Sequence, residues 1–141
     1  MKFSYDHNCF VCGDRNPIGM KVLYEDLGNG EVAGYFTPSA NHEGFPGYLH
    51  GGLAATLMDE TMARAINLLG VHGMTARMEV RYREKVPVEK PLVVTARVVQ
   101  NRRSIVDAEA KILLEDGTVA VESTARFMIV GKMEDPEISH K

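Results

Sequence analysis

The sequence predicts one α+β domain spanning residues 1–141, in which five or six antiparallel strands wrap around a single long helix. Two observations support this fold class. Apolar residues recur with a helical period between about residues 51 and 69, whereas most of the remaining chain alternates apolar and polar residues. A helix this apolar must be covered over most of its surface, and a sheet wrapped around it covers it economically.

The strands expected around this helix are separated by turn-forming residues. Asn29 between two glycines and the pair Asp116-Gly117 are typical hairpin turns, and Gly70 ends the helix. We expect residues 1–19 to be an irregular N-terminal segment and residues 131–141 to be a polar tail. The expected strands are 20–27, 31–37, 75–83, 92–100, 104–115 and 118–130.

Composition limits the classes of function. The formal net charge of -3 gives no general argument for nucleic-acid binding, and no apolar run is long enough to span a membrane. The stretch MKFSYDHNCFVCG at residues 1–13 lacks the apolar segment of a secretory signal. A hydrophobic content of 45% suits one domain with its own core. We therefore expect a cytoplasmic protein whose two cysteines are reduced.

Two neighbouring carboxylates, Asp59 and Glu60, lie inside the predicted helix. Glu60 shares a polar stripe with Arg64, four residues further on, so we expect it on a hydrated face in an ordinary ion pair. Asp59 has mostly apolar helical neighbours, among which an unpaired carboxylate is costly to bury. The residues support two interpretations of Asp59 equally: a general base or nucleophile, or a buried aspartate held by hydrogen-bond donors.

The tripeptide His50-Gly51-Gly52 begins the helix. A helix start presents free N–H groups, and glycine lets another group approach them closely, as in sites that polarise a carbonyl oxygen. Taken alone, an ordinary entry turn is the more frequent explanation, with His50 orienting the loop by a hydrogen bond. Gly51 and Asp59 are about 12 Å apart along the helix axis, so they could act on one group only across a symmetric dimer.

A threonine and several basic residues follow the helix. Thr75 could donate its hydroxyl to Asp59, although a β-branched residue is also common in strands. The period of two places Thr75 on the same strand face as Arg77, Arg81 and Arg83. Such basic side chains could bind the phosphates of a nucleotide-tailed ligand such as coenzyme A, but a solvated strand face is the default explanation.

Cys9-x-x-Cys12 supplies half of the ligands of a four-ligand zinc site. His7 and His42 could complete such a site only if folding brought them close. Two ordinary reduced thiols are the favoured interpretation. The missing strand-then-helix context argues against a thioredoxin-like redox site.

Three segments resemble one known family. They are LHGGLAATLMDE (49–60), CFVCGDRNPIGM (9–20) and TARMEVRYREKVP (75–87). Together they resemble the hotdog-fold acyl-CoA thioesterases, in the branch of the phenylacetate-pathway thioesterases and the mammalian thioesterase superfamily members. The resemblance covers residues 8–130. It implies the hotdog fold, in which a helix wrapped by an antiparallel sheet pairs as a homodimer or tetramer.

The resemblance also implies an activity and a site. The substrate would be an acyl-CoA hydrolysed to free acid and CoA, with no separate cofactor, metal, nucleic acid or membrane partner. Asp59 would activate water or attack the thioester carbonyl, Gly51 of the other subunit would polarise the carbonyl oxygen through its N–H, and Thr75 would assist the acid. The residues expected to bind substrate are His50, Gly52, Arg81 and Arg83.

Two alternatives stay open beside this function. One is a hotdog domain that binds acyl-CoA without hydrolysing it. The other is a different hotdog enzyme, such as a hydratase, whose Asp/His pair would be spaced differently from the residues here. Relatives often carry a polar residue upstream of the HGG motif, where this chain offers Asn41, His42 or Glu43. The length of the acyl group does not follow from the sequence.

Overall fold

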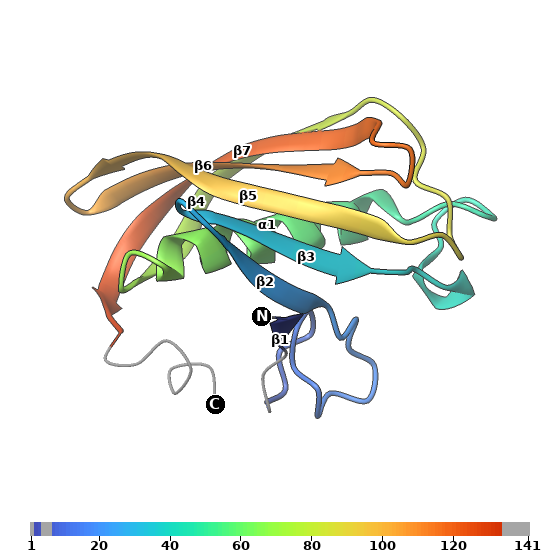
Figure 1. Ribbon diagram of the computed structural model, residues 1–141, viewed down its shortest axis with the longest axis horizontal. Coiled ribbons are helices and arrows are strands. Elements are labelled where there is room, and N and C mark those ends of the chain that lie inside the picture. The colour runs from blue at the N-terminus through green and yellow to red at the C-terminus, as the bar shows by residue number, and fades with distance from the viewer. Residues whose placement is uncertain (1, 4–6, 134–141) are drawn as a thin grey trace.

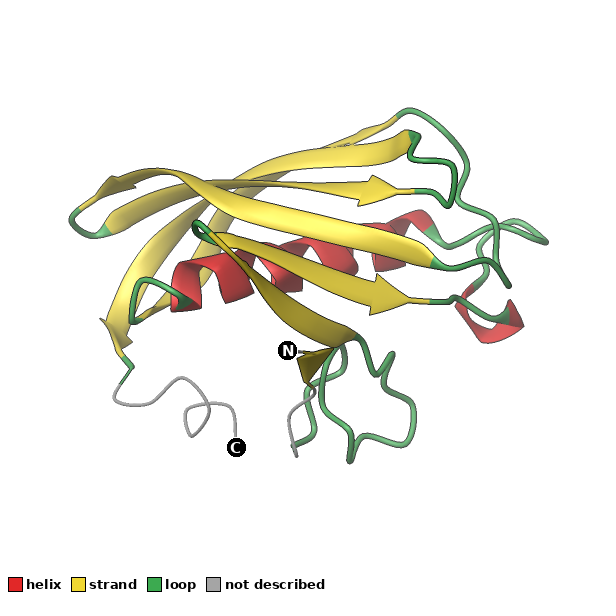
Figure 2. Ribbon diagram, viewed as in Figure 1, coloured by secondary structure: helices red, strands yellow, loops and turns green. Residues whose placement is uncertain are grey.

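The structure is a computed structural model that describes residues 2–3 and 7–133. Figure 1 shows one long helix lying inside the curve of an antiparallel sheet, and Figure 2 shows how much of the chain is strand. The helix is α1 (Gly51–Asn67), and a short 3-10 helix, η1 (Ala40–His42), precedes it. The strands are β1 (Lys2–Phe3), β2 (Leu23–Gly28), β3 (Glu31–Phe36), β4 (Val71–Tyr82), β5 (Leu92–Arg102), β6 (Ile105–Leu113) and β7 (Val119–Lys132).

The strand order in the sheet is β1-β2-β3-β5-β6-β7-β4, and every neighbouring pair is antiparallel. The chain leaves β3, passes along the sheet as α1 and returns as β4 on the far side of β7. This arrangement makes β4 an edge strand, although it is 12 residues long. The predicted wrapping of a long helix by an antiparallel sheet is therefore confirmed.

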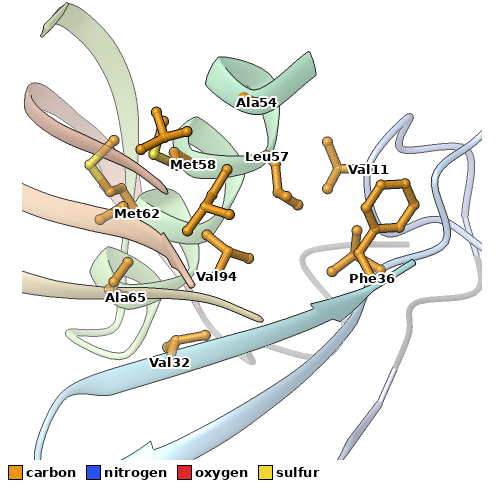
Figure 3. Close-up of a cluster of buried hydrophobic side chains, with 14 of the residues drawn as sticks. Val11, Val32, Phe36, Ala54, Leu57, Met58, Met62, Ala65 and Val94 are labelled. Carbon is orange, nitrogen blue, oxygen red and sulfur yellow. The ribbon is translucent and has the colours of Figure 1, made fainter. Parts of the chain in front are cut away.

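The core lies between α1 and the concave face of the sheet. The helix contributes its fully buried side chains Leu57, Met58, Met62 and Ile66. Each such side chain contributes about 1.5–3 kcal/mol when it leaves water. Figure 3 shows Met58 and Met62 pointing toward the sheet side and Leu57 pointing toward Val11 of the N-terminal loop. The helix is thus covered on one side by strands and on another by a loop.

Some element boundaries differ from the sequence prediction. The helix ends at Asn67 rather than at residue 69, and Gly70 then turns the chain with a φ of 82° that side chains rarely adopt. Strand β4 begins at Val71 rather than at residue 75, and β7 continues to Lys132. Residues 131 and 132 therefore pair with β4 instead of starting the predicted tail. Residues 134–141 of that tail lie outside the described residues.

The N-terminal loop, residues 7–22, is irregular as predicted but packs closely against the domain. Backbone hydrogen bonds link Met20 to Phe10 and Val22 to Val11, and the side chains of Val11 and Cys12 are buried in the core. The two-residue strand β1, which was not predicted from the sequence, pairs with β2. This loop therefore shields one side of α1 from water.

A β-bulge in β4 changes the direction of its side chains. Thr75 pairs with Phe127 and Arg77 pairs with Arg126, so Ala76 is an extra residue without its own partner. Thr75 consequently faces α1, on the same side as Met78, which packs against the core. The prediction that Thr75 shares a face with the arginines was wrong, because strict alternation assumes a strand without a bulge.

Candidate active site

The first turn of α1 is shaped by two hydrogen bonds. His50 caps the helix, and its Nδ1 accepts from the Gly52 N–H at 2.9 Å. The Tyr82 hydroxyl donates to the Gly51 carbonyl oxygen at 2.7 Å. Within residues 7–133, the Gly51 N–H donates no hydrogen bond and lies on an exposed residue. It therefore remains a free donor at the positive end of the helix.

Asp59 lies near the middle of α1 and is half-buried. The hydroxyl of Thr75 donates to Asp59 Oδ1 at 2.6 Å. This is the one hydrogen bond that the Asp59 side chain accepts within the described residues 7–133. The short bond fixes the carboxylate and leaves its second oxygen able to accept a proton. A hydroxyl orients the acid without neutralising its charge, as a general base requires.

The carboxylate and the free N–H belong to different parts of the helix. Gly51 and Asp59 are separated by about 12 Å along the axis, at 1.5 Å per residue. Beside them runs β4, the edge strand, on which Met74 is 65% exposed and Tyr82 is 55% exposed. Apolar side chains on an unpaired edge are typical of a surface that pairs with another chain.

The two arginines predicted to bind substrate lie away from Asp59 within one chain. Arg81 lines a shallow hollow of about 550 Å³ on the outer face of the sheet, opposite α1. Arg83 forms an ion pair with Glu122, with Nε and Oε2 2.5 Å apart. The described chain brings together Asp59 and Thr75 but does not bring either arginine to them.

The residues upstream of His50 are engaged in their own loop. His42 Nδ1 accepts from the Ser39 N–H at 2.9 Å, and Glu43 Oε2 accepts from the Gly47 N–H at 2.7 Å. The His42 carbonyl oxygen accepts from the His50 N–H at 2.9 Å, which ties this loop to the start of α1. His42 and Glu43 therefore serve to shape the loop that presents the helix start.

A second polar cluster, on another side of α1, was not anticipated. Arg64 is 4% exposed, with Nε 3.4 Å from Glu60 Oε2, and its Nη2 donates to Cys12 Sγ at 2.7 Å. The Cys12 thiol donates to Glu60 Oε2 at 3.2 Å, and Arg64 lies 5.0 Å from the centre of the Tyr24 ring. Burial raises the pKa of Glu60 to about 7. The prediction that Glu60 lies on a hydrated face was wrong, because the N-terminal loop covers that face.

The same cluster holds groups of the kind that bind metals. The ligand atoms of Cys9, Cys12 and Glu60 lie within 4.8 Å of one another, and no histidine joins them within the described residues. His7 Nδ1 instead accepts from the Cys9 N–H, and His42 packs its ring edge-on against Phe36. A zinc site completed by His7 and His42 is therefore not formed in the part of the chain that the structure describes.

The family model of the thioesterase superfamily matches residues 46–121, which is more than half of the chain. The chain belongs to the thioesterase superfamily. Its long helix inside a curved antiparallel sheet confirms the predicted hotdog fold of this superfamily. The matched region holds the whole of α1 and β4, and with them both Asp59 and Thr75.

Curated relatives in the superfamily include longer proteins. The acyl-coenzyme A thioesterase THEM4 of Xenopus laevis is 31% identical over 119 residues, which is 82% of this chain and 53% of that protein. The chain spans about half the length, or less, of the curated relatives it matches.

Solved members of the superfamily share the fold. The thioesterase superfamily protein RHA08564 is 30% identical, with a TM-score of 0.83 over 86% of this chain and 63% of that chain. A hypothetical thioesterase protein of Streptococcus pneumoniae, solved with coenzyme A, is 20% identical, with a TM-score of 0.74 over 79% of this chain and 88% of that chain. That protein was also solved as an Asp-to-Ala and a Thr-to-Ala variant.

No helix in residues 2–3 and 7–133 has the length and apolar character needed to cross a lipid bilayer.

Proposed function

We propose that this protein is an acyl-CoA thioesterase whose active site forms between two copies of the chain. The observation that carries the proposal is the 2.6 Å hydrogen bond by which Thr75 orients the Asp59 carboxylate on the open side of α1. The free Gly51 N–H at the start of the same helix supplies the second part of the site. Together they provide a base and an oxyanion donor, which thioester hydrolysis requires.

The substrate class follows from the relatives and from the chemistry of the site. The curated relatives are named acyl-coenzyme A thioesterases, and the streptococcal protein was solved with coenzyme A. The aspartate and threonine substituted in that streptococcal protein are 16 residues apart, which is also the separation of Asp59 and Thr75 here. This shared spacing supports the assignment of the pair to the reaction.

The proposed reaction begins with the thioester carbonyl oxygen against the Gly51 N–H. Negative charge that develops on this oxygen is stabilised by the N–H and by the helix dipole. Asp59 of the other chain takes a proton from water, and the water oxygen bonds to the carbonyl carbon. The carbon–sulfur bond then breaks, and the CoA thiolate leaves with the proton that Asp59 returns. An attack by Asp59 itself would form an anhydride that water opens to the same products.

A symmetric dimer is the part of the proposal that joins the two groups. The 12-residue edge strand β4 can pair with β4 of a second copy about a two-fold axis. Such pairing would set the two α1 helices side by side and bring the start of one to the middle of the other. Each dimer would then contain two sites, and each site would use Gly51 from one chain and Asp59 from its partner.

The first experiment measures hydrolysis of short-chain, long-chain and aryl acyl-CoAs by the wild-type protein. The disappearance of the thioester absorbance is the readout, because a thiol-reactive dye would also modify the protein's cysteines. We expect turnover with at least one acyl group, which would name the substrate class. Saturable binding of acyl-CoA without turnover of any substrate would instead identify a binding domain and contradict the proposed activity.

The second experiment tests whether the site crosses the interface. Gly51→Pro removes the N–H, and proline suits this position because it is favoured in the first turn and His50 has the extended ψ of 133° that precedes proline. We expect Gly51→Pro to lower turnover about 10²–10³-fold, as for loss of an oxyanion donor. Gly51→Ala keeps the N–H and is the matched control, with an activity close to that of the wild type.

Mixing two inactive dimers completes the test. A heterodimer of one Asp59→Asn chain and one Gly51→Pro chain contains one intact site if the site crosses the interface. Random exchange of subunits would therefore restore about a quarter of wild-type activity. If both variants form dimers and exchange subunits but activity does not return, each site lies within one chain. That result would overturn the interface site while leaving the hydrolase assignment in place.

A further inference from the structure

Cys9 and Cys12 occupy a single tight turn of the N-terminal loop. The Gly13 N–H donates to the Cys9 carbonyl oxygen at 2.9 Å, which closes one turn of helical type. Residues three apart in such a turn have Cα atoms about 5 Å apart, within the range that a disulfide bond needs. The two sulfur atoms lie within 4.8 Å of each other. The pair can therefore be joined without a large movement of the backbone.

Gly13 holds this turn against the preceding segment. A Cβ at this position would lie 2.2 Å from the His7 carbonyl oxygen and 2.4 Å from the Cys9 nitrogen, so no side chain fits there. The close approach keeps Cys9 next to Cys12 whether or not the sulfurs are bonded. The turn is thus shaped before any reaction takes place.

The two thiols have different surroundings. Cys9 is partly exposed, whereas Cys12 is fully buried beneath it. Cys12 contacts Arg64 through its sulfur and Glu60 through its proton. An exposed thiol above a buried partner is the arrangement of an attacking cysteine and a resolving cysteine. The buried side supplies a cation beside the sulfur and a carboxylate able to take its proton.

The acidities of the two thiols agree with these roles. When the single proton of Cys12 turns from Glu60 to the Cys9 sulfur, this hydrogen bond lowers the pKa of Cys9 to about 5, despite the opposing effect of partial burial. The hydrogen bond with Cys9, burial and the negative charge of Glu60 raise the pKa of Cys12 well above its ordinary value. Cys9 is therefore the nucleophile at neutral pH, and Cys12 reacts only when a base takes its proton.

A divalent metal is a poorer explanation of the same residues. Cys9, Cys12 and Glu60 provide three ligands, whereas structural zinc sites use four. Arg64 already places a positive charge against both Cys12 and Glu60. This guanidinium neutralises the cluster in the position where a metal would act, and a cation beside it would be repelled.

We propose that Cys9 and Cys12 form a redox-active dithiol, which low-molecular-weight disulfides convert into an intramolecular disulfide bond. The Cys9 thiolate attacks one sulfur of the reagent, whose S–S bond breaks and releases one thiolate. Cys12 gives its proton to Glu60 and attacks the Cys9 sulfur, which displaces the second thiolate. Two protein thiols are oxidised, and the reagent is reduced to two thiols. The reaction uses no residue of the proposed thioesterase site.

The test treats the reduced, folded protein with glutathione disulfide, alkylates the remaining thiols at intervals and measures the intact mass. We expect the wild type to lose two hydrogen atoms and to carry neither glutathione nor alkyl groups. Cys12→Ser should stop at one glutathione adduct on Cys9. Cys9→Ser should not react while folded, because its remaining thiol is buried. These two variants separate the attacking thiol from the resolving thiol.

Glu60→Gln tests the assigned proton acceptor. We expect the glutathione adduct of this variant to persist at least about tenfold longer than that of the wild type, with an unchanged rate of adduct formation. A reaction that requires denaturant, or equal reaction of both single-cysteine variants, would overturn the dithiol. One tightly bound zinc ion per purified chain would also overturn it. Thioester hydrolysis is measured separately, so failure of either proposal is recognised independently.

Discussion

Asp59 and Glu60 are consecutive residues of α1, but their carboxylates have different partners. Asp59 faces the edge strand β4, where the neutral hydroxyl of Thr75 donates to one oxygen. Glu60 faces the N-terminal loop, where Arg64 and the Cys12 thiol contact it. A hydroxyl orients a carboxylate without offsetting its negative charge, whereas the positive charge of a guanidinium offsets that negative charge. The comparison shows that the partner of a carboxylate, more than its position on the helix, decides whether a cation offsets its charge.

The largest predicted effect is on turnover, which should depend on Asp59 and not on Glu60. Asp59→Asn keeps the shape and the hydrogen bond from Thr75 but removes the proposed base, so we expect the rate of acyl-CoA hydrolysis to fall about 10²–10⁴-fold. Glu60→Gln, the matched change one residue further on, should retain turnover close to that of the wild type. Steady-state kinetics with a thermal-melting check on both variants make the comparison. Equal losses in the two variants would contradict the division of roles.

The next largest predicted effect is on the stability of the protein, and it concerns the contact between Arg64 and Glu60 beneath the N-terminal loop. Arg64→Met keeps an unbranched chain of similar length but leaves Glu60 without its cation, so we expect the free energy of unfolding to fall by about 2–3 kcal/mol. Combining it with Glu60→Gln should cost less than the sum of the two single changes, because no carboxylate remains to be compensated. Urea unfolding of the four proteins measures this coupling. Strictly additive losses would show that the two side chains do not interact.

The difference between the acids also shows where sequence reasoning succeeds. The helix, the strands β2 to β7 and the Asp59–Thr75 pair could be predicted, because they depend on local period and on family resemblance. The environment of Glu60 could not. It depends on Cys12, which lies 48 residues earlier in the chain and reaches the helix only through folding. Helical periodicity identifies which residues share a face, but it does not identify what covers that face.

Thr75 shows a second limit of prediction from sequence. Thr75 is the predicted partner of Asp59, but it lies on the strand face opposite to the predicted one. The error arises from a single extra residue, Ala76, which interrupts the alternation of β4. No feature of the segment TARME marks this bulge, because alanine is compatible with either a regular or a bulged strand. The β-bulge at Ala76 thus sets the direction of the Thr75 side chain, which completes the candidate site.

A smaller effect should appear in the pH dependence of stability. The pKa of Glu60 is raised from 4.5 to about 7 in the folded protein, so between these pH values the folded state holds a proton that the unfolded state has released. The free energy of unfolding of the wild type should therefore fall relative to Glu60→Gln as the pH rises from about 4.5 to 7, by about 1–3 kcal/mol in total. Denaturant unfolding of both proteins at several pH values measures this gap, the difference between their free energies of unfolding. A gap that stays constant across this window would contradict the burial of Glu60.

The smallest predicted effect concerns the hydroxyl of Thr75, which contacts Asp59 and has no counterpart beside Glu60 within the described residues. Thr75→Val preserves the β-branched shape on β4 but cannot donate to Asp59, so the carboxylate loses its orientation and keeps its charge. We expect kcat to fall about tenfold, equivalent to ~1.4 kcal/mol of transition-state stabilisation, with little change in KM. Thr75→Ser restores the donor and should recover most of the activity. If the serine variant is as slow as the valine variant, packing of the γ-methyl group beside the bulge, rather than the 2.6 Å hydrogen bond, positions Asp59.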